Sequence, residues 1–305
     1  MAFSEIYRRQ AALLIRLLPY VAEEESFALK GGTAINLFVR NMPRLSVDID
    51  LAYLPVQDRK KSLEEIDAAL KRISGRITKA IPGAHVHASQ HEGATTKLVV
   101  RSQNVQTIIE VTPVLRGCAY EPEIRAVAAA VEEAFGFAEI KVVSFADLYA
   151  GKIVAALDRQ HPRDLFDVLE LLAGEGIDDA VRQALVVYLL SHGRPMFALL
   201  APTRKDITQE FHRGFAGMTP EPVSQESLEK AREELIADIV GKMPKDHRRF
   251  LMSFEEGQPE WALLNVPGAK DLPAVRWRKQ KLDELPAEKR KALVDGLERI
   301  LGSKP

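Results

Sequence analysis

Residues 29–34 read Leu-Lys-Gly-Gly-Thr-Ala, and residues 48–51, a short distance further on, read Asp-Ile-Asp-Leu. Because side chains alternate across a strand, the carboxylates of Asp48 and Asp50 point to the same side and can share one or two hard cations such as Mg²⁺. Their neighbours are apolar, and a carboxylate in an apolar strand is costly unless it is paired or binds a metal. The combination predicts a site for a divalent metal.

The glycine pair is the second part of this pattern. We expect residues 27–29 to form a strand and a helix to run from Thr33 to about Val39. Without side chains in the way, the N–H groups of Gly31, Gly32 and Thr33 can approach phosphate oxygens at the positive end of this helix. A Gly-Gly pair alone is more typical of an ordinary strand-to-helix turn. Beside the aspartate pair, it indicates a nucleoside triphosphate site and nucleotidyl transfer.

Glu110 is the candidate for a third carboxylate. Residues 106–111 read as a β-branched strand, and its acidic residue can lie beside the Asp48 and Asp50 pair on a neighbouring strand. Two metals bridged by three carboxylates can activate an attacking hydroxyl and stabilise the leaving pyrophosphate. A lone carboxylate in a strand is more often a solvated edge group. In combination, we expect Asp48, Asp50 and Glu110 to bind Mg²⁺ or Mn²⁺.

A second group of charged residues begins in the helix predicted over residues 147–159. Lys152 and Arg159, seven apart, fall on nearly the same helix face, and the next predicted helix carries Asp164 and Asp167 one turn apart near its positive end. Lys152 can neutralise triphosphate charge, and Arg159 can orient the triphosphate or pair with an aspartate. From the residues alone, a helical hairpin held together by ion pairs is the stronger interpretation.

These motifs resemble the AbiEii/AbiGii family of nucleotidyltransferase toxins, which belongs to the DNA polymerase β-like nucleotidyltransferase superfamily. The resemblance rests on residues 29–34 and 44–51, on Lys152, and on residues 158–159 and 163–167, and it extends more loosely through the helical C-terminal half. It implies the toxin of a type IV-like toxin-antitoxin or phage-abortive system. Such a toxin would be encoded beside a cognate antitoxin and use a nucleoside triphosphate, and some members modify tRNA acceptor ends.

The resemblance also assigns roles to individual residues. Lys152 and Asp164 match the lysine and aspartate of the family's active cleft, so we expect Lys152 to contact the triphosphate. Whether Asp164 acts as a base or organises Lys152 stays open. The expected catalytic residues are Asp48, Asp50, Lys152 and Asp164, and the expected nucleotide-binding residues are Gly31, Gly32, Thr33, Ser46, Lys152 and Arg159.

Length and charge add limits to this interpretation. A chain of 305 residues usually forms two domains. We expect an α+β fold, with a nucleotidyltransferase core of mixed sheet and helices over residues 1–120. A helical domain over residues 121–305 would complete the active cleft and carry a substrate or partner surface. The net charge of −1 predicts no global attraction to nucleic acid. Contact with RNA would therefore need local basic runs such as residues 245–249 and 276–281, although such runs are usually solvated helix faces.

The remaining composition indicates a cytoplasmic protein. A single cysteine, Cys118, excludes an intrachain disulfide and fits a reducing compartment. No apolar run approaches the roughly 20 residues of a membrane span, and the N-terminus lacks a signal-peptide pattern. His85 and His87 share one face of a predicted strand, but no further ligand lies at suitable spacing, so we assign them no metal.

The leading hypothesis is a Mg²⁺-dependent nucleotidyltransferase toxin whose acceptor is RNA, with tRNA as the first candidate. One alternative keeps this chemistry with a small-molecule or protein acceptor. Another is a non-catalytic module that binds a nucleotide or a partner protein. The intact carboxylate pair argues against the second alternative, because a pure binding module has no need to hold like charges together.

Overall fold

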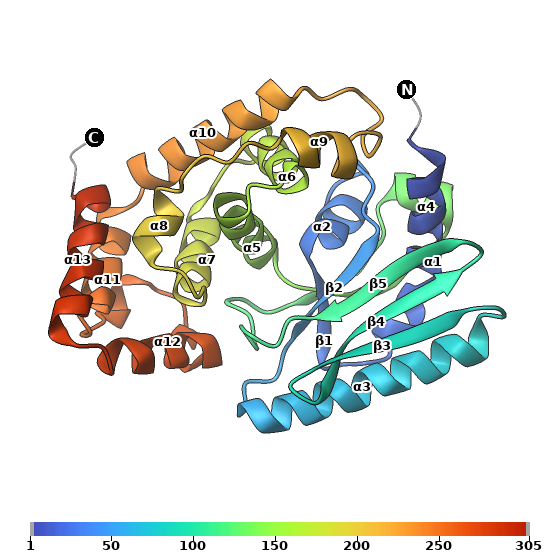
Figure 1. Cartoon of the computed structure of the whole chain (residues 1–305), viewed down its shortest axis with the longest axis horizontal. Helices are drawn as coiled ribbons and strands as arrows, with labels where there is room; N and C mark the ends of the chain where they lie inside the picture. Colours follow the sequence, from blue (N-terminus) through green and yellow to red (C-terminus); the bar gives the residue numbers. More distant parts are fainter. Residues whose placement is uncertain (1–2, 303–305) are drawn as a thin grey trace. The chain divides into compact units, whose positions relative to one another are not determined.

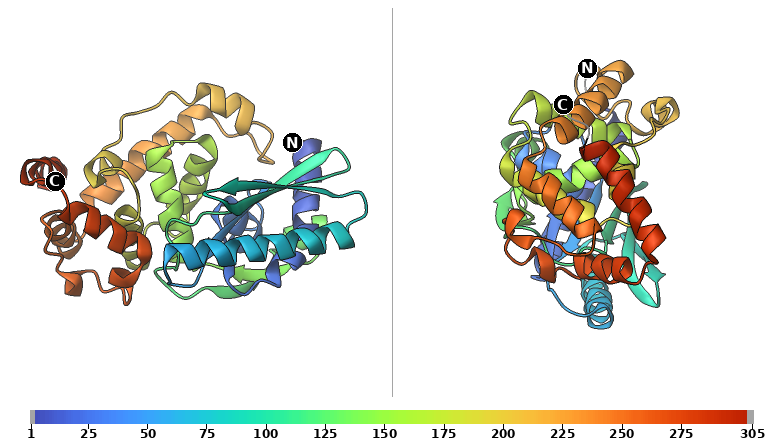
Figure 2. Two further views of the ribbon diagram at one scale, coloured as in Figure 1. Left: turned by 60° about the horizontal axis from the view of Figure 1, so that its bottom comes forward. Right: turned by 90° about the vertical axis from the view of Figure 1, so that its left-hand side faces the viewer.

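The computed structural model describes residues 3–302 and divides into two compact units (Figures 1 and 2). The first unit ends at Ser144 and also includes Phe215–Pro222, and the second contains Phe145–Gly214 and resumes at Val223. The first unit thus extends past the expected boundary at residue 120. The reason is that two short strands, β6 (Glu123–Ala126) and β7 (Glu139–Val142), pair into its sheet, whereas this region was expected to be predominantly helical.

A seven-stranded mixed sheet forms the first unit, in the order β3-β4-β5-β2-β1-β7-β6. Strand β2 pairs antiparallel with β1 on one side and parallel with β5 on the other. The sheet and the helical second unit confirm the expected α+β class. The other strands are β1 (Phe27–Lys30), β2 (Asp48–Tyr53), β3 (His85–His91), β4 (Ala94–Ser102) and β5 (Val105–Val111).

Helices α1 (Glu5–Ala22) and α3 (Arg59–Ala80) cover one face of this sheet, and α3 runs along β3 and β4 (Figure 2). Ile49, Leu51 and Tyr53 point to the covered face and are buried, and the Tyr53 hydroxyl is hydrogen-bonded to Glu65 of α3. Since successive side chains of a strand alternate, Asp48 and Asp50 leave the opposite face. The strand period therefore directs both carboxylates away from the helix-covered core.

Two helix boundaries differ from the sequence expectation. The first helix continues through Pro19 as far as Ala22, although a proline inside a helix commonly ends or kinks it. Leu18 and Val21, on either side of the proline, are both buried, and packing of this apolar face offsets the one backbone hydrogen bond that proline removes. After the glycine turn, the helix starts at Gly31 rather than Thr33, as α2 (Gly31–Ala34) followed by one π-helical segment, Ile35–Val39.

The second unit is helical. Its helix α5 (Phe145–Asp158) packs against α6 (Pro162–Ala173) and α7 (Asp179–Leu190), and α10 (Gln225–Gly241) packs against α6. The expected break between α5 and α6 is confirmed, with His161 as the N-cap of α6. The remaining α-helices are α8 (Met196–Leu200), α9 (Thr208–Gly214), α11 (Lys245–Glu255), α12 (Pro273–Asp283) and α13 (Ala287–Leu301), with α4 (Ala129–Phe135) in the first unit.

Candidate active site

The predicted carboxylates gather on the sheet face that α1 and α3 leave open. Asp50 of β2 is the direct cross-strand partner of Glu110 in the parallel pair with β5, and Asp48 lies two residues earlier on the same face. Neighbouring strands are about 4.8 Å apart, so the side chains of Asp50 and Glu110 are neighbours. All three residues are partly exposed. The predicted placement of Glu110 beside the aspartates is confirmed, and its role as a metal ligand stays a prediction.

A lysine that the sequence analysis did not single out pairs with Glu110. The Nζ of Lys97 in β4 lies 3.1 Å from the Oε2 of Glu110. Within residues 3–302, no three His, Cys, Asp or Glu side chains form a group that could hold a metal ion by themselves. Mg²⁺ in nucleotide-dependent sites is usually held by one or two carboxylates together with substrate phosphates and water. The Asp48 and Asp50 pair fits that donor set without a third carboxylate.

The glycine turn packs directly against the aspartate strand. Gly31 has a φ of +74°, a left-handed conformation that favours glycine, and a Cβ there would lie 2.8 Å from the Oδ2 of Asp50. A Cβ at Gly32 would lie 2.6 Å from an Nη2 atom of Arg44. Gly31 is therefore favoured by its backbone conformation and by Asp50, and a side chain at Gly32 would displace the guanidinium of Arg44.

Two buried hydroxyl groups connect the glycine turn to β2. The Oγ1 atom of Thr33 donates to the main-chain carbonyl of Asp48 at 2.5 Å and lies 3.0 Å from the Oγ of Ser46. Thr33 is 1% exposed and Ser46 6% exposed. The two hydroxyls thus hold the first turn of α2 against the strand that carries the aspartates. Their predicted contact with the nucleotide stays a prediction.

Arg44 is a buried charge beside this turn, for which sequence reasoning gave no role. It is 2% exposed, its Nη1 donates to the main-chain carbonyl of Leu45 at 3.0 Å, and its Nη2 lies against Gly32. A guanidinium is rarely buried unless its donors are satisfied. The only signal in the sequence was its place in the loop that leads into the aspartate strand.

In the second unit, Lys152 lies inside an ion cluster. Its Nζ is 2.8 Å from the Oδ1 of Asp164 and 2.9 Å from the Oδ2 of Asp167, and all three side chains are at least 94% buried. Asp167 was missed as a site residue, although its position one helical turn after Asp164 placed both carboxylates on one face of α6. The cluster agrees with the ion-paired hairpin that the residues alone favoured.

Arg159 completes this cluster from its surface. Its Nε lies 2.5 Å and its Nη2 3.0 Å from the two carboxylate oxygens of Asp164, and its side chain is 61% exposed. Burial alone would raise the pKa of Asp164, but the charge of Lys152 and the hydrogen bonds from Arg159 hold this pKa well below its usual range. A carboxylate with such a low pKa is a weak base, so the geometry favours Asp164 as the organiser of Lys152.

The two basic runs considered for RNA contact are partly used by the fold of the second unit. The Nη1 of Arg278 donates to the carbonyl of His192 at 2.6 Å, and its Nη2 lies 3.5 Å from the Oε1 of buried Glu255. The Nη1 of Arg248 donates to the carbonyl of Leu301 at 2.6 Å. These arginines satisfy internal groups, which reduces the charge that either run can offer to a nucleic acid.

Among the described residues, no helix has the length and apolar character that a membrane span needs.

Residues 12–280 match the family described as nucleotidyl transferase AbiEii toxin, type IV TA system. MenT4, a nucleotidyltransferase toxin from Mycobacterium tuberculosis H37Rv, is similar in structure, with a TM-score of 0.62, 18% identity, and coverage of 90% of this chain and 92% of that chain. At this identity, the likeness shows the fold alone.

A more distant structure is terminal uridylyl transferase 4 from Trypanosoma brucei with bound GTP. It has a TM-score of 0.32 and 11% identity, over 99% of this chain and 92% of that chain. Among curated proteins, none matches this chain.

Proposed function

Because the chain belongs to the AbiEii family of nucleotidyltransferase toxins, we propose that it transfers a nucleotide from a nucleoside triphosphate to an RNA acceptor, with tRNA as the first candidate. The observation that carries this proposal is the pair Asp48 and Asp50 on the open sheet face, packed against the turn at Gly31 and Gly32. The family description also supports a cognate antitoxin as a partner. The expected cytoplasmic location stays a prediction.

In this proposal, Asp48 and Asp50 hold Mg²⁺ or Mn²⁺, and Glu110 joins them when its ion pair with Lys97 opens. When bound, the metal would neutralise phosphate charge and acidify the attacking hydroxyl. The acceptor oxygen forms a bond to the α-phosphorus, the bond between the α-phosphorus and the bridging oxygen breaks, and pyrophosphate leaves while the hydroxyl proton passes to solvent. Gly31 and Gly32 keep side chains away from the carboxylates, so that the phosphates can approach.

The residues of the second unit supply positive charge to the triphosphate in this proposal. Arg159 presents an exposed guanidinium, and Asp164 fixes its direction through two hydrogen bonds. Asp164 and Asp167 fix the position of the buried Lys152 ammonium group. Thr33 and Ser46 act through the position of the glycine turn.

The test is transfer of label from each of the four α-³²P-labelled nucleoside triphosphates to total tRNA in the presence of Mg²⁺, followed by a denaturing gel. We expect label on RNA with the wild type, and a loss on the order of 10³-fold with Asp48→Ala, since a bound metal contributes several kcal/mol to such a transition state. Exposed Asp271 provides a matched control, and Asp271→Ala should keep wild-type transfer.

Each other outcome contradicts a stated part of the proposal. If no nucleotide labels RNA, the RNA acceptor is wrong. If label appears on protein or on a small molecule instead, the alternative acceptor class is correct. Equal transfer by Asp48→Ala and the wild type would contradict the assignment of the aspartate pair.

A further inference from the structure

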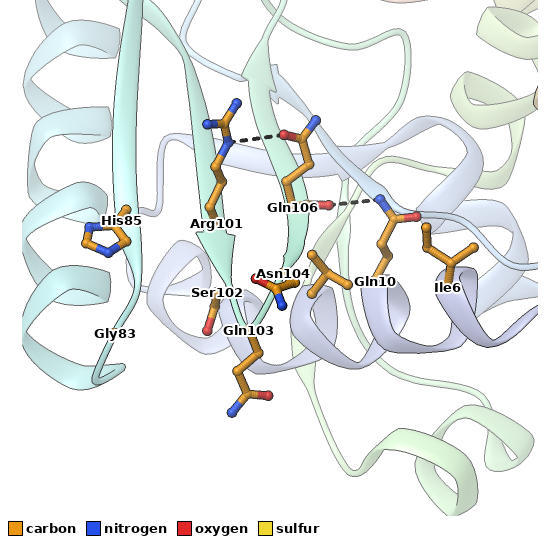
Figure 3. A pocket seen from close by; sticks show the side chains of 10 residues that line it. Ile6, Gln10, Gly83, His85, Arg101, Ser102, Gln103, Asn104 and Gln106 are labelled. Atoms are coloured by element: carbon orange, nitrogen blue, oxygen red, sulfur yellow. Dashed lines mark hydrogen bonds between the residues drawn. The ribbon is translucent and has the colours of Figure 1, made fainter.

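A cavity of about 550 Å³ lies at the end of the sheet where β4 turns into β5, entirely within the first unit (Figure 3). Its walls come from the N-terminal turns of α1, the start of β3, the end of β4, and the turn that leads into β5. The polar side chains of the lining are Gln10, His85, Arg101, Gln103, Asn104 and Gln106, to which Ser102 adds a hydroxyl. The cavity falls within the size range of sites for small ligands.

The register of the strands places three of the lining side chains on the same face as the carboxylates, whereas Val105 and the α1 residues of the lining belong to the helix-covered side. His85, Arg101 and Gln106 are cross-strand neighbours in one row, and Lys97, Glu110 and Asp50 are neighbours in another. Gln106 and Glu110 are four residues apart on β5, so they leave the same face about 13 Å apart. The exposed row and the partly exposed carboxylates therefore lie on one continuous face.

The chemistry of the lining fits a nucleotide. The amides of Gln10, Asn104 and Gln106 offer both donors and acceptors, as the edges of nucleobases require. Arg101 adds a positive charge, and Ile6 and Val105 add apolar surface that can contact the flat face of a base. None of the ten described residues that line the cavity is acidic, so an anionic chain meets no repulsion there.

Hydrogen bonds from α1 hold this cavity in shape. The Nη2 of Arg9 donates to the carbonyl of Gln103 at 2.6 Å. The Nε2 of Gln10 donates to the carbonyl of Gln106 at 3.0 Å (Figure 3). The Nε of Arg101 donates to the side-chain oxygen of Gln106 at 3.3 Å. These contacts tie the turn between β4 and β5 to the helix, so the polar groups of the lining are held in place before any ligand binds.

The turn itself carries an unusual residue. Gln103 and Asn104 both have positive φ, 49° and 63°, as a two-residue hairpin of this kind requires. Asparagine tolerates this conformation, whereas glutamine rarely adopts it and glycine is the common choice. A long amide side chain kept at a strained position of the lining is typical of a functional site.

We propose that this cavity binds a nucleotide of the single-stranded acceptor RNA, upstream of the hydroxyl that reacts. The distance of about 13 Å to the carboxylate row corresponds to about four stacked nucleotides. Val99 and Ile108, which lie on the same face between the two rows, would contact the intervening bases. This inference rests on the proposed function, because it takes the RNA as the acceptor.

The experiment compares a dinucleotide acceptor, which cannot reach the cavity, with an octanucleotide acceptor, which can. Arg101→Glu should raise the KM for the octanucleotide by about 10- to 100-fold, the loss typical of a nucleobase contact, with little change in kcat. Its KM for the dinucleotide should stay at the wild-type value. The control Lys79→Glu reverses an exposed charge on α3, which covers the other face of the sheet, and should behave as the wild type.

Direct binding separates a failure of this inference from a failure of the proposed function. Fluorescence anisotropy with a labelled octanucleotide and the Asp48→Ala protein needs no transfer. Adding Arg101→Glu, or the milder Gln106→Ala, to that protein should weaken the binding. If transfer to RNA occurs but neither variant changes KM or binding, the cavity assignment is wrong and the proposed function stands. If polyphosphate competes as well as RNA does, the cavity binds anions without reading bases, and the inference is also wrong.

Discussion

The two units of this protein place their aspartates in opposite environments. In the first unit, Asp48 and Asp50 share a partly exposed sheet face with Glu110. In the second, Asp164 and Asp167 are almost completely buried and share the ammonium group of Lys152. One group keeps like charges close together at the surface, and the other balances opposite charges inside the fold.

This difference indicates which group is needed for chemistry alone and which is also needed for stability. Like charges held together raise the free energy of the folded state, and they persist where a cation or a charged substrate uses them. A buried ion cluster is different, because removal of one partner leaves an uncompensated charge in a medium of low polarity. We therefore expect variants of the two groups to separate activity from stability.

The largest expected difference is between two single variants, one in each unit. Asp164→Ala removes the carboxylate that both Lys152 and Arg159 contact, and should lower the free energy of unfolding by about 3–5 kcal/mol. Asp50→Asn relieves repulsion on the sheet face, so it should change the free energy of unfolding by less than about 1 kcal/mol. It should nevertheless reduce nucleotide transfer on the order of 10³-fold.

Urea denaturation and the transfer assay, applied to both variants, provide the measurement. The Asp167→Ala variant is a further check, because it removes the second carboxylate from Lys152 and should also destabilise the protein. If Asp50→Asn unfolds as readily as Asp164→Ala does, the contrast between the two groups is wrong.

Much of the carboxylate group of the first unit could be predicted, because its arrangement depends on residues close together in the sequence. The period of a strand is two, so a pair of aspartates two residues apart must share a face, and the apolar neighbours indicate which face is buried. The neighbouring strand of Glu110 was also correct, since its β-branched run was visible in the sequence. The break before α6 followed from residues 160–162, whose proline disfavours a continuing helix, and the structure adds His161 as the cap.

The missed features depend on contacts between distant residues. Strands β6 and β7 have only four residues each and become strands by pairing, which no local pattern shows. Helical spacing placed Lys152 and Arg159 on one face, but it could not indicate that Lys152 is buried while Arg159 is exposed. The sequence also gave no indication of the roles of Arg44 and Lys97, because these depend on contacts with Gly32 and Glu110, which lie elsewhere in the chain.

In the first unit, a substitution at Gly32 tests whether the glycine turn is a packed part of the site. Gly32→Ala would place a Cβ 2.6 Å from Arg44 and 3.2 Å from Ser46, both of which are buried. We expect a loss of about 1–3 kcal/mol in the free energy of unfolding, as for other substitutions that overpack a core. The KM for the nucleoside triphosphate should rise because the turn is displaced.

Gly75 offers a matched control. It lies in the middle of α3, and a Cβ there meets nothing within 4 Å. Gly75→Ala should therefore stabilise the protein by up to about 1 kcal/mol, since alanine favours a helix more than glycine does. Thermal unfolding of both variants measures the difference. Equal stability of the two would contradict the close packing of the turn on Arg44.

The smallest effect concerns His161, which caps α6 beside the ion cluster of the second unit. Burial and the charge of Arg163 lower the pKa of His161 to about 4, compared with its ordinary value of 6.5. Because the folded state binds this proton less readily, the contribution of His161 to stability is complete above pH 6.5 and decreases as the pH falls towards 4. With allowance for the partial exposure of the ring, the loss is about 1–2 kcal/mol.

His161→Asn isolates this contribution. Asparagine can accept the same hydrogen bond from the N–H of Arg163, so the cap is kept while the titrating ring is removed. Urea unfolding at pH 7 and pH 5 should show the wild type losing stability relative to the variant by about 1 kcal/mol. Burial also lowers the pKa values of His192 and His247, but both proteins contain them, so their effects cancel in the comparison. Because the ordinary pKa of aspartate is about 4 and the pKa of Asp164 lies below its usual range, that group stays ionised throughout this interval. A stability difference between the two proteins that does not change with pH would therefore contradict the role of His161.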